Sequence, residues 1–125
     1  MALDVLGMVQ IGLTVKDLAK AKEFYGETLG LNLAVETDLM LFFSVGGLRL
    51  MVGTENQAGT AGSGGAVFYL ETPNIHEAHD HIEEKGVHIH RPPFIAHSDA
   101  SFEMWLCFFQ DDDGNVLAFV ESRDL

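Results

Sequence analysis

The sequence contains an internal repeat, and this is the feature that most constrains its fold. Two helix caps, two apolar stripes and two terminal glycines recur in the same order with offsets that differ by one residue, so chance similarity between two amphipathic helices is the weaker explanation. With an offset of 57 residues, Asp17, Leu18, Ala21 and Tyr25 correspond to Asn74, Ile75, Ala78 and Ile82. With an offset of 56, Gly30 and Leu31 correspond to Gly86 and Val87. The chain is therefore predicted to contain two copies of one supersecondary unit.

The first copy predicts a strand, a helix and three further strands. Strict alternation over residues 9–15 is typical of a half-buried strand. Asp17 is a suitable N-cap for a helix that runs to Leu29, with Gly30 just past its end. The three further strands are expected at 31–35, 39–45 and 48–52, the last two joined by a hairpin turn at Gly46-Gly47.

The second copy predicts the same order after a glycine-rich connector at 54–65. A strand at 66–71 precedes a helix that Asn74 caps and that Gly86 ends. The remaining strands are expected at 87–89, ended by Pro92-Pro93, and at 104–110 and 116–121, joined by a turn at Asp113-Gly114.

These elements predict an α+β fold made of two βαβββ modules. Module 1 spans residues 1–53 and module 2 spans 66–125, and together they form one domain over 1–125. The apolar face of each sheet is expected to pack on its own helix, which leaves a mixed face open. Two such sheets would form a cup-shaped, partly open β-barrel with the helices outside and one ligand pocket inside.

Composition excludes several classes of partner. Seven basic and 19 acidic residues give a net charge of −12, which disfavours binding to nucleic acid and to anionic membrane surfaces. The single cysteine, Cys107, cannot form an internal disulfide, and this favours a reducing compartment. Residues 1–12 lack the basic start of a signal peptide. The chain is therefore expected to be soluble and cytoplasmic.

Both ends of the chain resemble the vicinal oxygen chelate superfamily, which includes glyoxalase I, bleomycin-resistance proteins and extradiol dioxygenases. The N-terminal resemblance comprises Gln-Ile-Gly-Leu-Thr-Val-Lys-Asp at 10–17, Phe24-Tyr25 and Leu-Gly-Leu at 29–31. The C-terminal resemblance is the segment 108–119, in which Asp112 stands where proline is common. The resemblance implies the paired-module fold and does not specify a reaction.

The resemblance also implies where a metal would be bound in metal-dependent relatives. Four strands each contribute one ligand, and the corresponding residues here are Gln10, Arg49, Val67 and Ala118. A divalent ion needs several oxygen or nitrogen donors with negative charge among them. A shift of register could bring Glu71 or Glu121 inward, but it would not replace Arg49 with an acid. We therefore expect no metal and no other cofactor in this pocket.

The histidines are expected to lie mostly outside the site. The pairs His76/His79 and His88/His90 have spacings that could chelate a metal, yet mixed His/Asp/Glu faces are usually solvated. His97, in the segment before the penultimate strand, is a candidate pocket-rim residue for hydrogen bonding or acid–base chemistry, with a surface loop position as the alternative.

Arg49 is the principal candidate for ligand binding. Strand alternation places Arg49 and Met51 on the open face, where a guanidinium requires an anionic partner. That partner is either a ligand carboxylate or phosphate, or Glu71 in an internal ion pair. Tyr69, Met51 and Trp105 are expected to supply an apolar wall, with plain core packing as the alternative for Trp105.

The expected function is metal-independent binding of a small molecule, in the manner that the resemblance to bleomycin-resistance proteins implies, with a pocket for an anionic ligand. The alternative is an enzyme of the glyoxalase I or dioxygenase type, acting as a lyase, isomerase or dioxygenase. A third reading is a metal-independent enzyme that uses His97 or Glu71 as a base. Open strand edges, and relatives that pair, also lead us to expect a homodimer.

Overall fold

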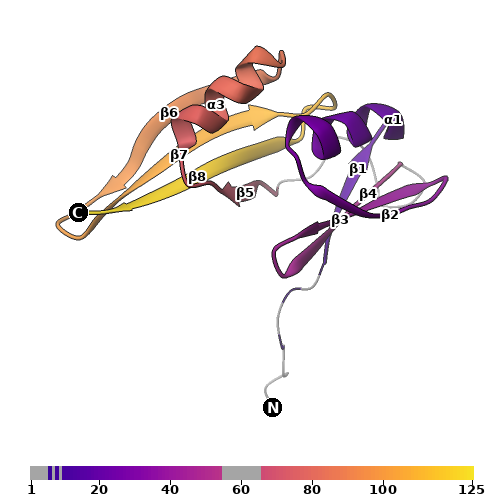
Figure 1. The fold of residues 1–125 in the computed structure, drawn as a ribbon, viewed down its shortest axis with the longest axis horizontal. Coiled ribbons are helices and arrows are strands. Elements are labelled where there is room, and N and C mark those ends of the chain that lie inside the picture. Colours follow the sequence, from indigo (N-terminus) through magenta and orange to yellow (C-terminus); the bar gives the residue numbers. More distant parts are fainter. Residues whose placement is uncertain (1–5, 7, 9, 55–65) are drawn as a thin grey trace. The chain divides into compact units, whose positions relative to one another are not determined.

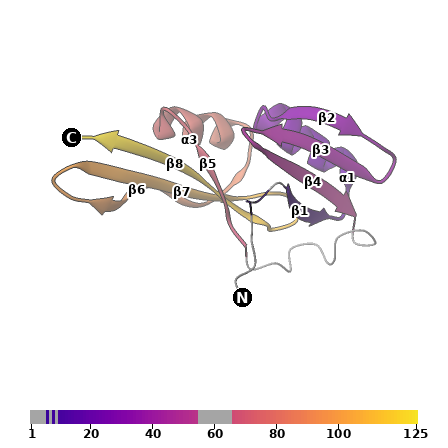
Figure 2. The same ribbon diagram turned by 90° about the horizontal axis from the view of Figure 1, so that it is seen from below.

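The structure is a computed structural model that describes residues 6, 8, 10–54 and 66–125. It divides into two compact units, Met1–Ala61 and Gly62–Leu125. Most of the predicted connector, residues 55–65, lies outside the described residues, whereas Thr54 belongs to a strand. Each unit is an α+β arrangement of one four-stranded sheet with helix on one face (Figures 1 and 2).

The first module has the strand order β1-β4-β3-β2. Strand β1 pairs in parallel with β4, and the other pairs in this sheet are antiparallel. The helical segment between β1 and β2 provides the crossover that a parallel pair requires. The strands are β1 (Gln10–Val15), β2 (Asn32–Glu36), β3 (Met40–Val45) and β4 (Leu48–Thr54).

The second module has the corresponding order β5-β8-β7-β6, with β5 parallel to β8. Helix α3 (Ile75–Glu84) lies along one face of this sheet (Figure 2). The strands are β5 (Phe68–Glu71), β6 (His88–Ser98), β7 (Phe102–Gln110) and β8 (Val116–Asp124). The identical strand order of the two sheets confirms the predicted repeat.

Both predicted helices begin and end where their sequence signals place them. The side chain of Asp17 accepts a hydrogen bond from the backbone of Lys20, and Asn74 caps α3 in the same way. Gly30 and Gly86 follow the helices with φ of 73° and 80°, a conformation that favours glycine.

The first helix changes its winding after one turn, which the sequence signals did not predict. Helix α1 (Leu18–Ala21) continues as a π-helix, η1 (Lys22–Thr28), in which Leu29 N–H donates to the carbonyl of Phe24 at 2.9 Å. Phe24 and Tyr25 are adjacent in sequence, yet both rings are buried in this segment, with their centroids 4.9 Å apart.

Strand β6 corrects the expectation of a short strand ended by Pro92-Pro93. The strand continues through both prolines to Ser98, with shifts of register along its pairing with β7. Proline lacks the N–H that an inner strand needs, but β6 is at the edge of its sheet and needs partners on one side only. Register shifts of this kind, as in a β-bulge, accommodate residues that cannot pair.

The apolar face of each sheet packs on its helix, as the alternation predicts. In the first module Leu41, Phe43, Leu50 and Val52 are buried, and the rings of Phe43 and Tyr25 lie 6.1 Å apart. The corresponding core of the second module consists of Ile75, Ile82, Cys107, Phe109, Leu117 and Phe119. No helix in the described part of the chain is both long and apolar enough to cross a membrane.

A buried carboxylate joins α3 to the last strand. Glu121 of β8 accepts a hydrogen bond from the backbone N–H of Ile75 at 2.7 Å and a second one from Arg123. These two bonds lower the pKa of the Glu121 carboxyl below its usual value, with the Arg123 bond the larger cause. The first-turn N–H of a helix has no partner within the helix, so Glu121 satisfies a group that burial would otherwise leave unpaired.

We predict that Glu121→Gln destabilises the second module by about 1–3 kcal/mol near neutral pH, the range for losing a charged acceptor of a buried bond. Because the folded-state pKa is depressed, the carboxylate stabilises the fold above its unfolded pKa, and this contribution is lost as the pH falls through the folded pKa. Thermal unfolding of both proteins from pH 7 to pH 3 should show curves that converge at acid pH. A difference that does not depend on pH would contradict this role.

Candidate functional site

The open face of the first sheet brings together three of the predicted site residues. The buried residues Leu50 and Val52 point toward the helix, so Arg49 and Met51 lie on the other face of β4. The parallel register sets Gln10 beside Arg49 and Gly12 beside Met51. The parallel pairing thus juxtaposes residues about forty positions apart in sequence.

A short chain of polar contacts orients the guanidinium of Arg49. Its Nε donates to Oε1 of Gln10 at 2.7 Å, and Nε2 of Gln10 lies 3.6 Å from the Sδ atom of Met51. Both ends of the Gln10 amide therefore have partners, and this fixes which end faces Arg49.

An aromatic ring on β3 completes this cluster, and the sequence analysis missed it. Phe42 is opposite Met51 in the hairpin register, and the Cζ atom of Arg49 lies 5.7 Å from its ring centroid. That distance is within the range of a cation–π interaction. The Gly46-Gly47 turn could have predicted this neighbour, because the hairpin register that starts at the turn pairs Phe42 with Met51.

The two terminal nitrogens of Arg49 belong to an exposed side chain. Within the described part of the chain, these Nη groups have no hydrogen-bond partner. Two parallel N–H groups at the end of a guanidinium match the two oxygens of a carboxylate or phosphate. The arrangement can therefore bind an oxyanion end-on, with Gln10 holding the other edge of the guanidinium.

The four positions that metal-dependent relatives would use do not fit a divalent ion. Oε1 of Gln10 already accepts the Nε–H of the cationic Arg49, and a second cation there would be repelled. Val67 and Ala118 have aliphatic side chains without donor atoms. Neither the number of donors nor the sign of the charge suits a metal ion.

The second module places Tyr69 in a row of aromatic rings. The register of β5, β8 and β7 sets Tyr69, Ala118 and Phe108 side by side, and the rings of Tyr69 and Phe108 meet edge to face at 6.3 Å. Phe94 stacks on Phe108 at 6.0 Å, and Arg91 lies over Phe94 at 3.5 Å. Tyr69 is 56% exposed, so its ring is the part of this row that is open to contact with an apolar group.

Arg91, Phe94 and Phe108 were not among the predicted site residues. Arg91 and Phe94 flank Pro92-Pro93, the pair of prolines that had indicated the end of a strand. Alternation along β7 could have placed Phe108 on the open face of the sheet, because its neighbours Cys107 and Phe109 belong to the core on the other face.

Of the two positions predicted for Trp105, the structure shows packing against the core and not a place in the ligand-binding wall. It shares a face of β7 with the buried residues Cys107 and Phe109, and this face packs on α3. The indole lies between the ring of His76, 5.1 Å away, and the guanidinium of Arg123, 4.7 Å away. Strand alternation from Cys107 explains this position.

His97 lies in β6 and is tied to the hairpin turn that follows. Its Nε2 is 2.8 Å from Oδ2 of Asp99, and Oδ1 of Asp99 accepts hydrogen bonds from the backbone and hydroxyl of Ser101. These bonds hold the pKa of the Asp99 carboxyl well below its usual value, with His97 the largest cause.

Glu71 is exposed at the end of β5. An ion pair between Glu71 and Arg49 would connect the two modules, and this ion pair stays a prediction.

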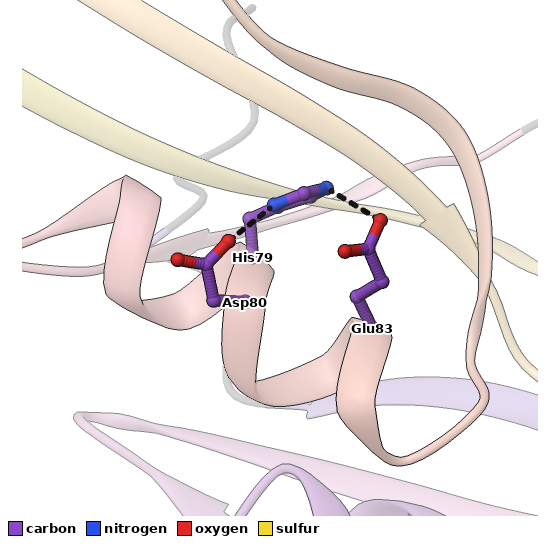
Figure 3. A group of neighbouring side chains, drawn as sticks. All are labelled: His79, Asp80 and Glu83. Carbon is purple, nitrogen blue, oxygen red and sulfur yellow. Dashed lines mark hydrogen bonds and ion pairs between the residues drawn. The ribbon is translucent and has the colours of Figure 1, made fainter.

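The histidines of α3 differ from the expectation of a uniformly solvated face. The side chain of His79 is only 13% exposed and lies between the carboxylates of Asp80 and Glu83 (Figure 3). His88 and His90 are exposed on β6.

Comparisons with known proteins place these modules in a family. Residues 7–119 match the Glyoxalase/Bleomycin resistance protein/Dioxygenase superfamily. Because this match covers most of the chain, the protein belongs to that superfamily. It is 25% identical over 120 residues to the metallothiol transferase FosB of Staphylococcus haemolyticus, an alignment that spans 96% of this chain and 68% of FosB.

Solved structures show the same fold. A superfamily member from Sphaerobacter thermophilus superimposes with a TM-score of 0.76 at 24% identity, covering 94% of this chain and 98% of its own. TnmS3, an antibiotic-binding protein from Streptomyces sp. CB03234, superimposes with a TM-score of 0.76 at 21% identity, covering 98% and 100%.

We predict that Gln10 is not a metal ligand. Wild-type protein and Gln10→Ala should retain equal amounts of zinc, nickel or manganese after dialysis, because Oε1 of Gln10 is engaged by Arg49. Elemental analysis of both proteins checks this. One equivalent of metal in the wild type that disappears in Gln10→Ala would contradict it.

Proposed function

We propose that this protein binds a small anionic molecule without a metal ion and that Arg49 contacts the anionic group. The observation that carries the proposal is the fixed guanidinium, held by Gln10 at 2.7 Å with both Nη groups unpaired in the described structure. A chain with a net charge of −12 repels anions at long range, so the binding of an anion needs a local feature of this kind.

The comparisons support the class of function. The superfamily includes bleomycin-resistance proteins, and one structural neighbour is an antibiotic-binding protein. We propose that Met51 and Phe42 in the first module contact the apolar part of a ligand. Tyr69, in the second module, stays a predicted ligand-binding residue. Glu71 and His97 remain proposed ligand-binding residues in the second module, and a cytoplasmic homodimer is the form in which we expect the protein to work.

The rival function is catalysis. It is favoured by the sequence similarity to FosB, which is named as a metallothiol transferase. The residues at the ligand positions argue against a shared metal-dependent mechanism, since Arg49 places a positive charge where such a mechanism needs a carboxylate.

The ligand can be found by thermal shift with a library of metabolites and antibiotics, because a ligand that binds only the folded state raises its melting temperature. We expect hits that contain a carboxylate or phosphate. Their methyl esters or neutral analogues are the matched control compounds, and they should produce a smaller shift.

For such a ligand, Arg49→Ala should weaken binding by on the order of 2–5 kcal/mol if the ligand desolvates the pair. Arg49→Lys should also weaken binding, because lysine lacks the planar pair of donors. Lys20→Ala is the matched control, since Lys20 is an exposed cation on α1 in the same module. Titration calorimetry measures the affinities, and thermal unfolding measures the stabilities. A lower melting temperature with unchanged affinity in Arg49→Ala would contradict the anion site and favour the ion pair with Glu71.

A further inference from the structure

His79 on helix α3 has a feature that the proposed function does not use. Its Nε2 atom is buried and has no hydrogen-bond partner among the described residues. A buried polar atom without a partner is rare in folded proteins, because it loses its hydrogen bonds to water without replacement. The mixed His/Asp/Glu pattern of this helix face predicts that it is solvated, but the side chain of His79 is only 13% exposed.

The two nitrogens of His79 face two different carboxylates (Figure 3). Nδ1 is 3.1 Å from Oδ1 of Asp80, a hydrogen-bonding distance, whereas Nε2 is 3.6 Å from Oε2 of Glu83. If Asp80 accepts the Nδ1 proton, the neutral ring directs the lone pair of Nε2 toward a negative carboxylate. Two acceptors that face one another repel, and this repulsion is relieved either by a proton on Nε2 or by a bound cation.

The separation of Nε2 and Oε2 suits a shared metal ion. Zinc binds imidazole nitrogen at about 2.0–2.1 Å and carboxylate oxygen at about 2.0–2.2 Å. At those lengths, atoms 3.6 Å apart subtend roughly 120° at the ion, which is close to a tetrahedral angle. His79 and Glu83 are four residues apart on one helix, so both reach the same side of α3.

Asp80 then has a positioning role. A histidine that binds a metal usually donates its other N–H to a carboxylate, which fixes the tautomer and the orientation of the ring. The bond from Nδ1 to Asp80 matches that arrangement and leaves Nε2 as the ligand atom. Glu83 is 64% exposed, so its carboxylate can adjust to the ion, and solvent can supply the remaining ligands.

We propose that α3 binds one zinc-type divalent ion through Nε2 of His79 and the carboxylate of Glu83, with Asp80 orienting the imidazole. Mixed imidazole and carboxylate ligation favours zinc, cobalt or nickel over calcium and magnesium, which prefer sets of oxygen ligands. This site is in the second module and shares no residue with the anion site around Arg49. The ion is held independently of ligand binding.

The proposal is tested by titrating the full chain with zinc chloride at neutral pH in a calorimeter. We expect one ion per chain in the wild type, at least tenfold weaker binding in Glu83→Gln, and unchanged binding in Glu84→Gln. Glu84 is the matched control, because it is an exposed glutamate on the same helix and its substitution changes the charge equally. An excess of calcium or magnesium should not displace the zinc.

Further variants separate the roles of the three residues. Asp80→Asn should weaken binding less than Glu83→Gln, because the asparagine oxygen still accepts the Nδ1 proton. Nitrogen NMR of the imidazoles should show zinc shifting the Nε2 resonance of His79, a readout that does not require a destabilising substitution at this buried ring.

Three outcomes would overturn the proposal: no zinc binding in the wild type, equal loss in Glu84→Gln and Glu83→Gln, or a larger loss in Asp80→Asn than in Glu83→Gln. Loss of the ion in Gln10→Ala would instead contradict the proposed metal-free function. The two proposals therefore fail on different variants.

Discussion

The parallel pairing of the first and last strands within each module is the constraint on which the rest of the structure depends. A parallel pair requires a long crossover, so a helix must follow the first strand and pack on one face of the sheet. The opposite face has no helix packed on it, and the strand register alone determines which of its residues are neighbours. This pairing brings Gln10 beside Arg49 in the first module and Tyr69 beside Ala118 in the second.

The two open faces have the same topology and different chemistry. In the first module the Gln10 amide holds the guanidinium of Arg49, which engages the only side-chain oxygen among the four positions that metal-dependent relatives would use. In the second module the small side chain of Ala118 lies between the rings of Tyr69 and Phe108, which meet across it. Substitution at positions that face the open side thus changes the chemistry without changing the fold.

Much of the fold could be predicted from the sequence because its signals are local. Asp17 and Asn74 cap the helices, Gly30 and Gly86 follow them with positive φ, and the Gly46-Gly47 turn joins β3 to β4. The prolines of β6 were misleading, since their effect depends on whether the strand is at an edge, and this is a property of the whole sheet.

The site was harder to predict because it depends on contacts distant in sequence. Alternation correctly predicts the face that Arg49 shares with Met51, but it does not specify the partner of each polar atom. The position of Trp105 could have been derived from its spacing to Cys107, whereas the burial of His79 between two carboxylates required the structure. Local sequence patterns indicate the face on which a residue lies, and the three-dimensional contacts determine its chemistry.

The central claim is that Gln10 acts on the ligand through Arg49, and a double-mutant cycle tests it most directly. The affinity of a carboxylate-containing ligand would be measured for the wild type, Gln10→Ala, Arg49→Ala and the double variant. If Gln10 positions the guanidinium, Gln10→Ala weakens binding in the wild-type background and has no effect once Arg49 is alanine. Independent, additive losses from the two substitutions would contradict the account.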